Sequence, residues 1–173
     1  VAGGGTSGVP AALAAAGSGA RTALIEQHAD VGGVRSTGGV ASYWFGRETP
    51  YQLACDEAYD RYSESSGMAE EVAMLQCLLD LDVNVLSCCP TVGVVCRDDR
   101  VLGAVVATDE GLAVVQGKTI VDATGDADLA AWAGVPCEYG NGRDAWTMWA
   151  SFANFNAEKR TASRQYESGI EVR

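Results

Sequence analysis

The residues with the clearest chemical meaning are the glycines near the start of the chain and an acid that follows them. Gly3, Gly5 and Gly8 form a G-x-G-x-x-G pattern, and Glu26 stands 18 residues after Gly8. In such a turn the first glycine permits a tight bend, the second lets a phosphate approach the main chain, and the third allows close helix–strand contact. Backbone N–H groups at the helix start hold the phosphates, and the acid accepts hydrogen bonds from a ribose. The spacing predicts a dinucleotide site.

The elements that must position these residues follow from the same stretch of chain. Segment 7–17 is rich in alanine, the strongest helix former, and predicts the helix behind the glycine turn. Pro10 fits that helix only in its first turn, where the missing N–H has no helical partner. Segment 21–25 predicts a second, parallel strand that places Glu26 at its carboxyl end. Ligands bind at that edge of open α/β sheets.

The next part of the chain departs from a plain nicotinamide-binding pattern. Residues 29–50 form a long glycine-rich loop, and loops of this length in compact domains are usually functional. Two helices, 51–66 and 68–81, and a short strand, 83–86, are then predicted from the apolar spacing. Five apolar residues of the second helix are expected to face the core: Val72, Leu75, Leu78, Leu79 and Leu81.

Three closely spaced apolar segments predict an antiparallel meander inserted between the parallel elements. They are 91–96, 101–107 and 112–116, and acidic turns separate them. Segment 119–122 is expected to return to the main sheet and to lead into a helix at 129–133. Asp126 and Asp128 are predicted to serve as the N-cap and a first-turn acid of that helix.

The composition is that of a globular protein with an acidic surface. The chain has 173 residues, a net charge of −11 and a pI near 4.4. Such a surface repels phosphate backbones, so we expect no nucleic acid partner, whereas a dinucleotide held by backbone amides is compatible with it. No apolar run approaches the roughly 20 residues that span a bilayer, so we expect no membrane association.

The six cysteines do not have the spacing of a metal site. None belongs to a C-x-x-C pair, and the sole histidine, His28, lies near no cysteine in the sequence. Adjacent Cys88 and Cys89 admit two interpretations: a vicinal redox pair, or two thiols on opposite faces of a strand. Free, mostly buried thiols fit a reducing cytoplasm, where we expect the protein to act.

Several motifs that follow one another in a fixed order carry a resemblance to a known family. The glycine loop and ribose acid are followed by a Gly-Gly loop, a meander, the stretch Val121-Asp-Ala-Thr-Gly-Asp126, and the turn Ala133-Gly-Val-Pro136. Over about residues 1–137 the chain resembles the FAD-dependent oxidoreductases of the two-dinucleotide-binding-domain class, related to glutathione reductase and the fumarate reductase flavoprotein. The resemblance implies an α/β, Rossmann-like FAD/NAD(P)-binding domain with a parallel central sheet, helices on both sides and an inserted antiparallel three-stranded β-meander. It also implies FAD as cofactor.

The resemblance assigns the cofactor-binding residues position by position. The FAD pyrophosphate would be held by the first loop: Gly3, Gly5, Thr6, Ser7 and Gly8. Glu26, with Gln27 beside it, would bind at the adenosine ribose. The diphosphate would be followed towards the flavin ring by Gly32, Gly33, Arg35, Ser36 and Thr37. Val92 would offer backbone groups to adenine, and the cofactor would be closed over by Ala123, Thr124 and Gly125. The family usually has a small residue where this chain has Arg35.

The same resemblance sets the expected domains and activity. Residues 1–137 would be the FAD-binding domain, with its first strand truncated because only Val1 and Ala2 precede the glycines. Residues 138–173 would open an incomplete substrate domain, so the chain alone is expected to be inactive. The parent enzyme would transfer hydride or electrons between a small organic substrate and the flavin, with homo-oligomerisation left open. The alternatives are an NAD-binding dehydrogenase domain and a non-catalytic FAD-binding remnant. No catalytic residue and no metal site are assigned.

Overall fold

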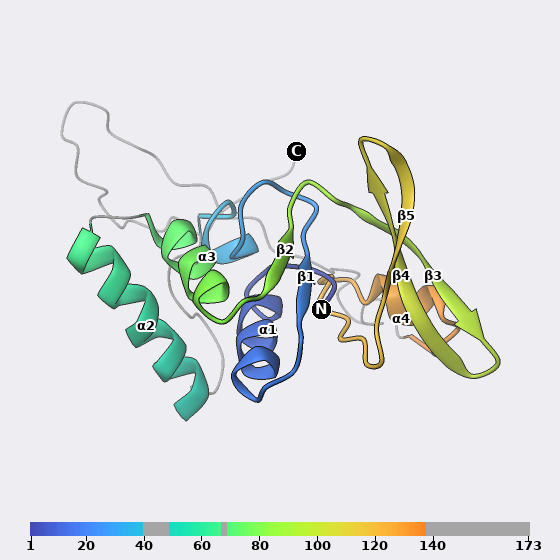
Figure 1. Cartoon of the computed structure of the whole chain (residues 1–173), viewed down its shortest axis with the longest axis horizontal. Coiled ribbons are helices and arrows are strands. Elements are labelled where there is room, and N and C mark those ends of the chain that lie inside the picture. Colours follow the sequence, from blue (N-terminus) through green and yellow to red (C-terminus); the bar gives the residue numbers. More distant parts are fainter. Residues whose placement is uncertain (40–48, 67–68, 138–173) are drawn as a thin grey trace, which may run out of the picture. The chain divides into compact units, whose positions relative to one another are not determined.

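The structure, a computed structural model, describes residues 1–39, 49–66 and 69–137 (Figure 1). Residues up to Pro136 form one compact unit. Its helices and strands, in chain order, are α1 (Gly8–Gly17), β1 (Ala23–Ile25), the 3₁₀ turn η1 (Gly33–Arg35), α2 (Pro50–Ser66), α3 (Glu70–Asp80), β2 (Asn84–Leu86), β3 (Thr91–Arg97), β4 (Arg100–Thr108), β5 (Gly111–Gln116) and α4 (Asp128–Trp132). Each of the elements expected between residues 7 and 133 therefore has a counterpart, except that segment 119–122 contributes a bridge and no full strand.

The parallel part of the sheet is built around β1. Its partner on one side is β2, with Ala23 opposite Asn84 and Ile25 opposite Leu86. On the other side Ala2 forms a parallel bridge with Ile25, and Ala2 forms a second parallel bridge with Asp122. The order across the sheet is thus β2, β1, Ala2 and Asp122. The predicted return of segment 119–122 to this sheet is confirmed at Asp122.

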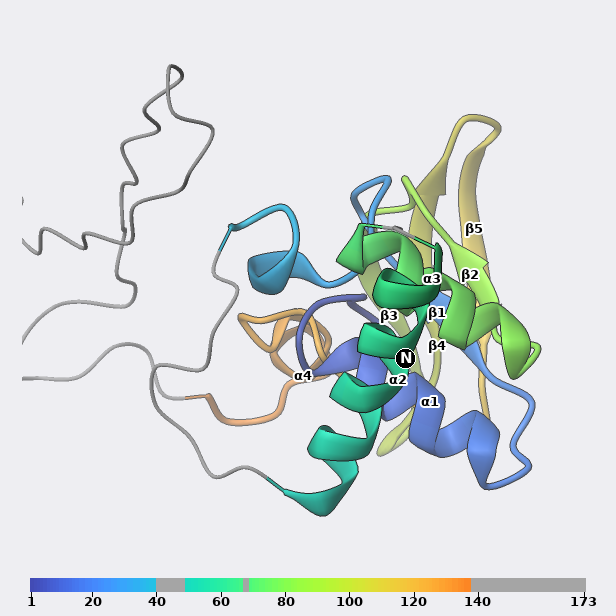
Figure 2. The same ribbon diagram turned by 90° about the vertical axis from the view of Figure 1, so that its left-hand side faces the viewer.

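One face of the sheet is covered by α1 and α3, with α2 packed outside them (Figures 1 and 2). Pro10 lies in the first turn of α1, as the sequence required, since the helix begins at Gly8. The core on this face consists of Val9, Ala12, Leu13, Leu24, Val31, Cys55, Tyr59, Ala73, Met74, Cys77, Leu78 and Val83. Alanines along α1 let the helix approach the sheet closely, which places the start of α1 at the sheet edge.

The predicted apolar stripe of α3 is confirmed at Leu75 and Leu78, which pack in the core, and is wrong for its other three residues. Val72, Leu79 and Leu81 are 45%, 49% and 43% exposed. The buried positions are instead Ala73, Met74, Cys77 and Leu78, which repeat at i and i+4. The two stripes share Leu78 and differ elsewhere by about one residue, or roughly 100° around the helix. Both are apolar, and packing against α1 and α2 selects the one with smaller and more flexible side chains.

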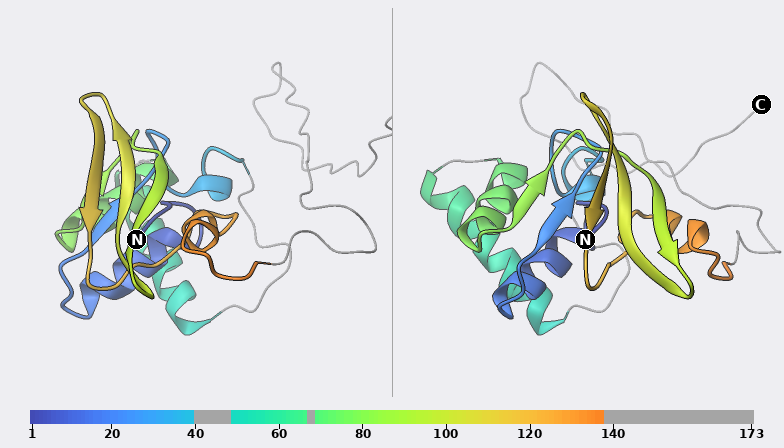
Figure 3. Two further views of the ribbon diagram at one scale, coloured as in Figure 1. Left: turned by 90° about the vertical axis from the view of Figure 1, so that its right-hand side faces the viewer. Right: turned by 45° about the vertical axis from the view of Figure 1, so that its right-hand side comes forward.

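The opposite face of the sheet is covered by the meander and α4 (Figure 3). Strands β3, β4 and β5 pair antiparallel in chain order, which confirms the predicted meander. A second core joins the sheet, the meander and α4, and it contains Ala2, Ile25, Ala104, Val106 and Leu129. Helices therefore lie on both faces, as expected from the sequence. Within the described ranges, no helix has the length and apolar character needed to cross a bilayer.

The cysteines differ from the expectation that most are buried. Cys55 and Cys77 are buried, whereas Cys88, Cys96 and Cys137 are exposed. Cys88 has φ +55° and lies in the turn after β2, not in a strand. Its exposed thiol and the partly buried Cys89 therefore owe their different environments to a turn rather than to strand alternation.

Candidate functional site

In the first glycine loop the backbone packs so closely at two positions that no side chain fits there. Gly3 has φ +91°, and a Cβ there would overlap the carbonyl oxygen of Ala123. A Cβ at Gly8 would overlap the carbonyl oxygen of Gly3. At Gly5, by contrast, an added Cβ would meet nothing within 4 Å. Two glycines thus permit tight packing, and the middle glycine borders open space that a ligand can enter.

The start of α1 is suited to an anion. The N-cap residue Ser7 makes no side-chain hydrogen bond to the helix, and the first turn contains no acid. Thr6 and Ser7 are exposed. The positive end of the helix dipole therefore has no negative partner from the helix itself.

Glu26 lies directly beside this loop at the carboxyl end of β1. Its side chain is only 6% exposed, and its two oxygens accept hydrogen bonds from the N–H groups of Gly4 and His28, each at 2.7 Å. A carboxylate has about four acceptor positions, so capacity for a diol remains. Gln27 is exposed next to it, with Nε2 3.3 Å from His28 Nε2.

Backbone hydrogen bonds join the turn after β2 to the residues that follow β1. The Cys89 N–H donates to the Glu26 carbonyl at 2.9 Å, and the Cys88 N–H donates to the His28 carbonyl at 3.0 Å. Val92 lies further along, in β3, and is exposed. A register shift between Thr91 and Gly93 leaves Val92 without an opposing residue on β4. Its peptide groups are therefore outside the regular pairing of the ladder.

The second glycine loop packs against the first. The Gly32 N–H donates to the Gly4 carbonyl at 2.8 Å, and a Cβ at Gly33 would lie 2.9 Å from the Cα of Gly5. Both glycines have positive φ, +102° and +56°. Ser36 Oγ donates to the Val31 carbonyl at 2.7 Å and closes the turn.

The remaining two residues of this loop differ in their surroundings. Thr37 is exposed. Arg35 is largely buried and pairs with Asp56 of α2 and Glu70 of α3. Burial lowers the pKa of Arg35, but hydrogen bonding and charge attraction from the two carboxylates outweigh it and raise the pKa.

The third segment of the site, 123–125, is held by Asp122. Asp122 Oδ1 accepts from the Thr124 N–H at 3.1 Å and from Thr124 Oγ1 at 2.7 Å, and its Oδ2 accepts from the Ala130 N–H at 2.8 Å. Ala123 contacts the first loop through its N–H, which donates to the Ala2 carbonyl at 2.8 Å. Gly125 is exposed with φ +93°, and an added Cβ there would meet nothing within 4 Å.

The cap of α4 corrects the prediction for Asp126. The N-cap position is Ala127, which has φ +58°, and Asp126 makes no cap. Thr124 Oγ1 accepts from the Asp128 N–H at 2.9 Å, and Asp122 reaches Ala130 in the same helix. Asp128 is the first-turn acid, as predicted. Burial raises the pKa of Asp122, but the hydrogen bonds from Ala130, Thr124 and Leu129 outweigh it and hold this pKa below its usual value.

A match to a family model decides the identity of this arrangement. The model described as FAD dependent oxidoreductase matches residues 1–170. The chain belongs to the FAD-dependent oxidoreductase family. FAD is therefore its cofactor, as the sequence predicted.

Solved structures share the fold of this flavoprotein. The THI4 protein of Thermovibrio ammonificans is 19% identical with a TM-score of 0.53, over 76% of this chain and 58% of that one. L-proline dehydrogenase from P. horikoshii is 15% identical with a TM-score of 0.55, over 79% and 55%. A geranylgeranyl bacteriochlorophyll reductase-like protein from Thermoplasma acidophilum is 21% identical with a TM-score of 0.56, over 77% and 40%. No curated protein sequence matches the chain. The flavoprotein chain thus aligns with between about two fifths and three fifths of each of these structures.

The flavoprotein brings most of the predicted residues into one region. Gly3, Gly5, Gly8, Glu26, Gly32, Gly33 and Ala123 are linked by the contacts given above. Val92 and Gln27 make no such contact with the glycine loops in the described structure. Sequence reasoning missed Gly4, whose N–H binds Glu26 and whose added Cβ would lie 3.0 Å from Glu26 Oε2. The signal available for it was the unbroken run of three glycines.

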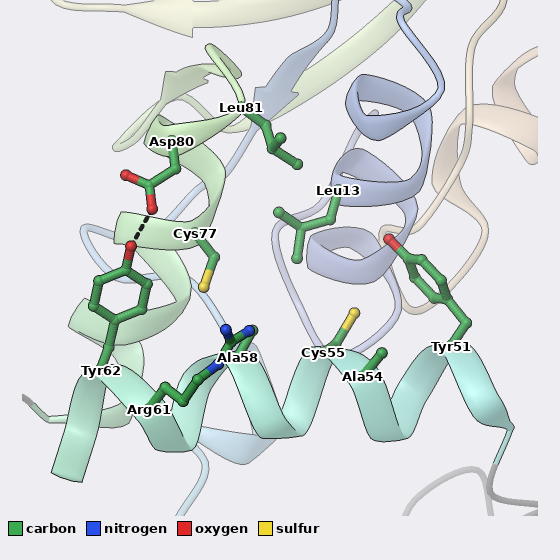
Figure 4. Close-up of a pocket in the computed structure, with 10 residues that line it drawn as sticks. All are labelled: Leu13, Tyr51, Ala54, Cys55, Ala58, Arg61, Tyr62, Cys77, Asp80 and Leu81. Atoms are coloured by element: carbon green, nitrogen blue, oxygen red, sulfur yellow. Dashed lines mark hydrogen bonds between the residues drawn. The ribbon is translucent and has the colours of Figure 1, made fainter. Parts of the chain in front are cut away.

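A cavity of about 480 Å³ lies elsewhere, between α2 and the pair formed by α1 and α3 (Figure 4). Leu13, Cys55 and Cys77 line it, and the Tyr62 hydroxyl donates to Asp80 at its rim. Burial raises the pKa values of both thiols, so they are protonated at neutral pH. None of the predicted cofactor residues borders this cavity. A dinucleotide lies along an exposed loop edge, so the glycine geometry, and not this cavity, locates the cofactor.

Proposed function

We propose that the first glycine loop receives the FAD pyrophosphate and that Glu26 binds the adenosine ribose. The observation that supports this is the difference among the three glycines: Gly3 and Gly8 are filled by backbone contacts, whereas the space at Gly5 is open. Gly5 does not have a positive φ, so its backbone conformation alone does not require a glycine. The open space at Gly5 is the cradle that an extended pyrophosphate requires.

The electrostatics of the loop support the same placement. The start of α1 has no acidic residue, although the chain as a whole carries a net charge of −11. The carboxylate of Glu26, which lies beside the loop, is turned towards the N–H groups of Gly4 and His28. Phosphates are therefore bound by backbone donors and the helix dipole rather than by a lysine or arginine.

The other two segments complete the proposed site. The turn 32–37 lies against the first loop, and its Gly32, Gly33, Ser36 and Thr37 would follow the cofactor towards its ring, while 123–125 would close over it from the next strand end. The irregular backbone at Val92 would face adenine. When bound, FAD supplies the hydride or electron chemistry, and this chain provides binding and orientation.

We propose further that the protein oxidises or reduces a small organic substrate in the cytoplasm. Cys55, Cys77, Cys88, Cys89 and Cys96 are free thiols, which fits a reducing compartment. The proposed substrate domain, residues 138–173, lies outside the described residues, as do the apolar residues Val40, Tyr43, Trp44 and Phe45 of the long loop. We propose that residues 1–137 supply the flavin site.

Cofactor release and flavin reduction test the proposal together. Denaturing the purified protein and comparing the released compound with FAD, FMN and NAD standards should give FAD. NAD alone would favour a dehydrogenase domain. Anaerobic addition of small amines, amino acids and hydroxy acids, followed by bleaching of the flavin absorbance, would then identify the substrate class. FAD that neither substrates nor artificial dyes can reduce or oxidise would indicate a non-catalytic cofactor.

A further inference from the structure

Arg35 is held by side chains that are distant from it in the sequence. Its Nη1 pairs with Asp56 on α2, and its Nε pairs with Glu70 on α3. The guanidinium also lies over the ring of buried Tyr59, 5.7 Å from the ring centroid. Only 15% of the Arg35 side chain is exposed, so the two carboxylates and the ring are what compensate its loss of water.

The backbone of the same residue is joined to the first glycine loop. The Arg35 N–H donates to the Gly32 carbonyl at 3.2 Å, and the Gly32 N–H donates to the Gly4 carbonyl at 2.8 Å. Gly33, at the start of the same short turn, approaches Gly5 so closely that an added Cβ would lie 2.9 Å from its Cα. The position of Gly5 therefore depends on where the turn containing Arg35 is held.

The space between Arg35 and the first loop excludes a phosphate. A cavity of about 10 Å³ is bordered by Arg35, Gly5 and Thr6. That volume accommodates about one water molecule. The guanidinium is also committed to two carboxylates, which together carry more charge than it does. Arg35 thus has neither the room nor the free charge to bind a phosphate from this side.

We propose that Arg35 is a positioning residue for FAD, whose ion pairs with Asp56 and Glu70 hold the second glycine loop against the first without contact with the cofactor. The proposal rests on the placement of the pyrophosphate at Gly5. It explains how a long cation is accommodated beside the first glycine loop. It also assigns a role to α2 and α3, because their residues Asp56 and Glu70 hold the turn that packs against the first glycine loop.

Two variants distinguish positioning from direct contact: Arg35→Met, and the double variant Asp56→Asn with Glu70→Gln. FAD affinity is measured by flavin fluorescence, and the affinity of adenosine monophosphate is measured by displacement of FAD. Both variants should weaken FAD by about tenfold, a typical strength for coupling between neighbouring sites. Both should weaken adenosine monophosphate less than FAD, by about threefold, because Glu26 still holds its ribose and only one phosphate, rather than two, lies at the displaced loop.

Two further variants serve as rescue and control. Arg35→Lys should recover part of the FAD affinity, because an ammonium pairs with one carboxylate but lacks the fork that engages two. Arg61→Met removes an exposed arginine from α2 and should change neither affinity. If Arg35→Met does not fold, the double variant and Arg35→Lys provide the test.

Three results would overturn the proposal. FAD binding by the double variant at or above the wild-type affinity, with weak binding by Arg35→Met, would show that Arg35 contacts the phosphates. Equal loss of FAD and adenosine monophosphate would show a general structural role. Unchanged FAD affinity in every variant would show that the loop is positioned without these ion pairs. A wild-type protein that does not bind FAD would contradict the proposed function instead, and is distinct from all three.

Discussion

The two glycine loops of the flavin site reach their shapes by different means. The first loop is fixed by backbone contacts, since Gly3 and Gly8 pack where a single β-carbon would overlap a carbonyl oxygen. The second loop touches the first through Gly32 and Gly33, but its far side is fastened by the ion pairs of Arg35. The first loop is therefore held by backbone packing at its glycines. The second loop is held by its glycines on one side and by the ion pairs of Arg35 on the other.

This difference explains why the contacts that hold the first loop can be predicted from the sequence, whereas the ion pairs that hold the second cannot. Steric limits act within a few residues, so they leave a fixed spacing of glycines that can be read directly. Ion pairs join residues whose separation follows from the fold; Arg35 and Asp56 are 21 residues apart. Changes in the first loop should consequently affect folding or binding sharply, and changes around the second should be more graded.

The largest effect is expected at Gly8, where a methyl group has no room. Gly8→Ala should lower the free energy of unfolding by about 3 kcal/mol or more, because α1 must move away from Gly3. Gly17→Ala, at the other end of α1, places its methyl group in open space and should change this free energy by less than about 0.5 kcal/mol. Urea unfolding measures both. Equal stability of the two variants would show that the packing at Gly8 has been misjudged.

Replacement of Glu26 should affect both binding and stability. Glu26→Ala removes a charge-assisted hydrogen bond to the ribose, worth about 1.5–3 kcal/mol, which corresponds to roughly a ten- to hundredfold loss of FAD affinity. It also leaves the N–H groups of Gly4 and His28 without their acceptor, so the protein should be less stable even without FAD. Exposed Asp30→Ala is the control for loss of a nearby charge. Wild-type FAD affinity in Glu26→Ala would refute the ribose assignment.

The smallest effect is expected at Asp122, whose hydrogen bonds join the 123–125 segment to α4. Asp122→Asn keeps only one acceptor oxygen and should cost about 1 kcal/mol of unfolding free energy at pH 7. The pKa of Asp122 is lowered in the folded protein, so its stabilising contribution is present above the ordinary carboxyl pKa and is lost as pH falls through the lower folded value. The difference between wild type and variant should therefore shrink below about pH 4. A difference that is constant down to pH 2 would assign the loss to packing.

Much of the fold was predictable because its signals are local. The alanine content predicts α1, and three apolar segments separated by acidic turns predict the meander. The buried face of α3 was not predictable from periodicity, because residues on both sides of Leu78 are apolar and only contact with α1 and α2 decides between them. The apolar pattern predicts the helix but not which of its faces is buried.

The site shows the same division. The glycine roles and Glu26 followed from spacing, and the structure brings these residues into contact. The cap of α4 was assigned to Asp126 because a cap normally stands next to the helix, whereas Asp122 reaches it from the preceding strand end. The partners of Arg35 could not be found at all without the packing of α2 and α3.

The central claim is that the open face of Gly5 receives the FAD pyrophosphate, and one titration tests it most directly. FAD is added to wild type, to Gly5→Val and to Gly17→Val, two positions at which an added Cβ meets nothing within 4 Å. Gly5→Val should remain as stable as wild type without FAD but lose about a hundredfold or more in FAD affinity, because a side chain occupies the phosphate position. Gly17→Val should bind FAD like wild type. Unchanged FAD binding by a folded Gly5→Val protein would contradict the claim.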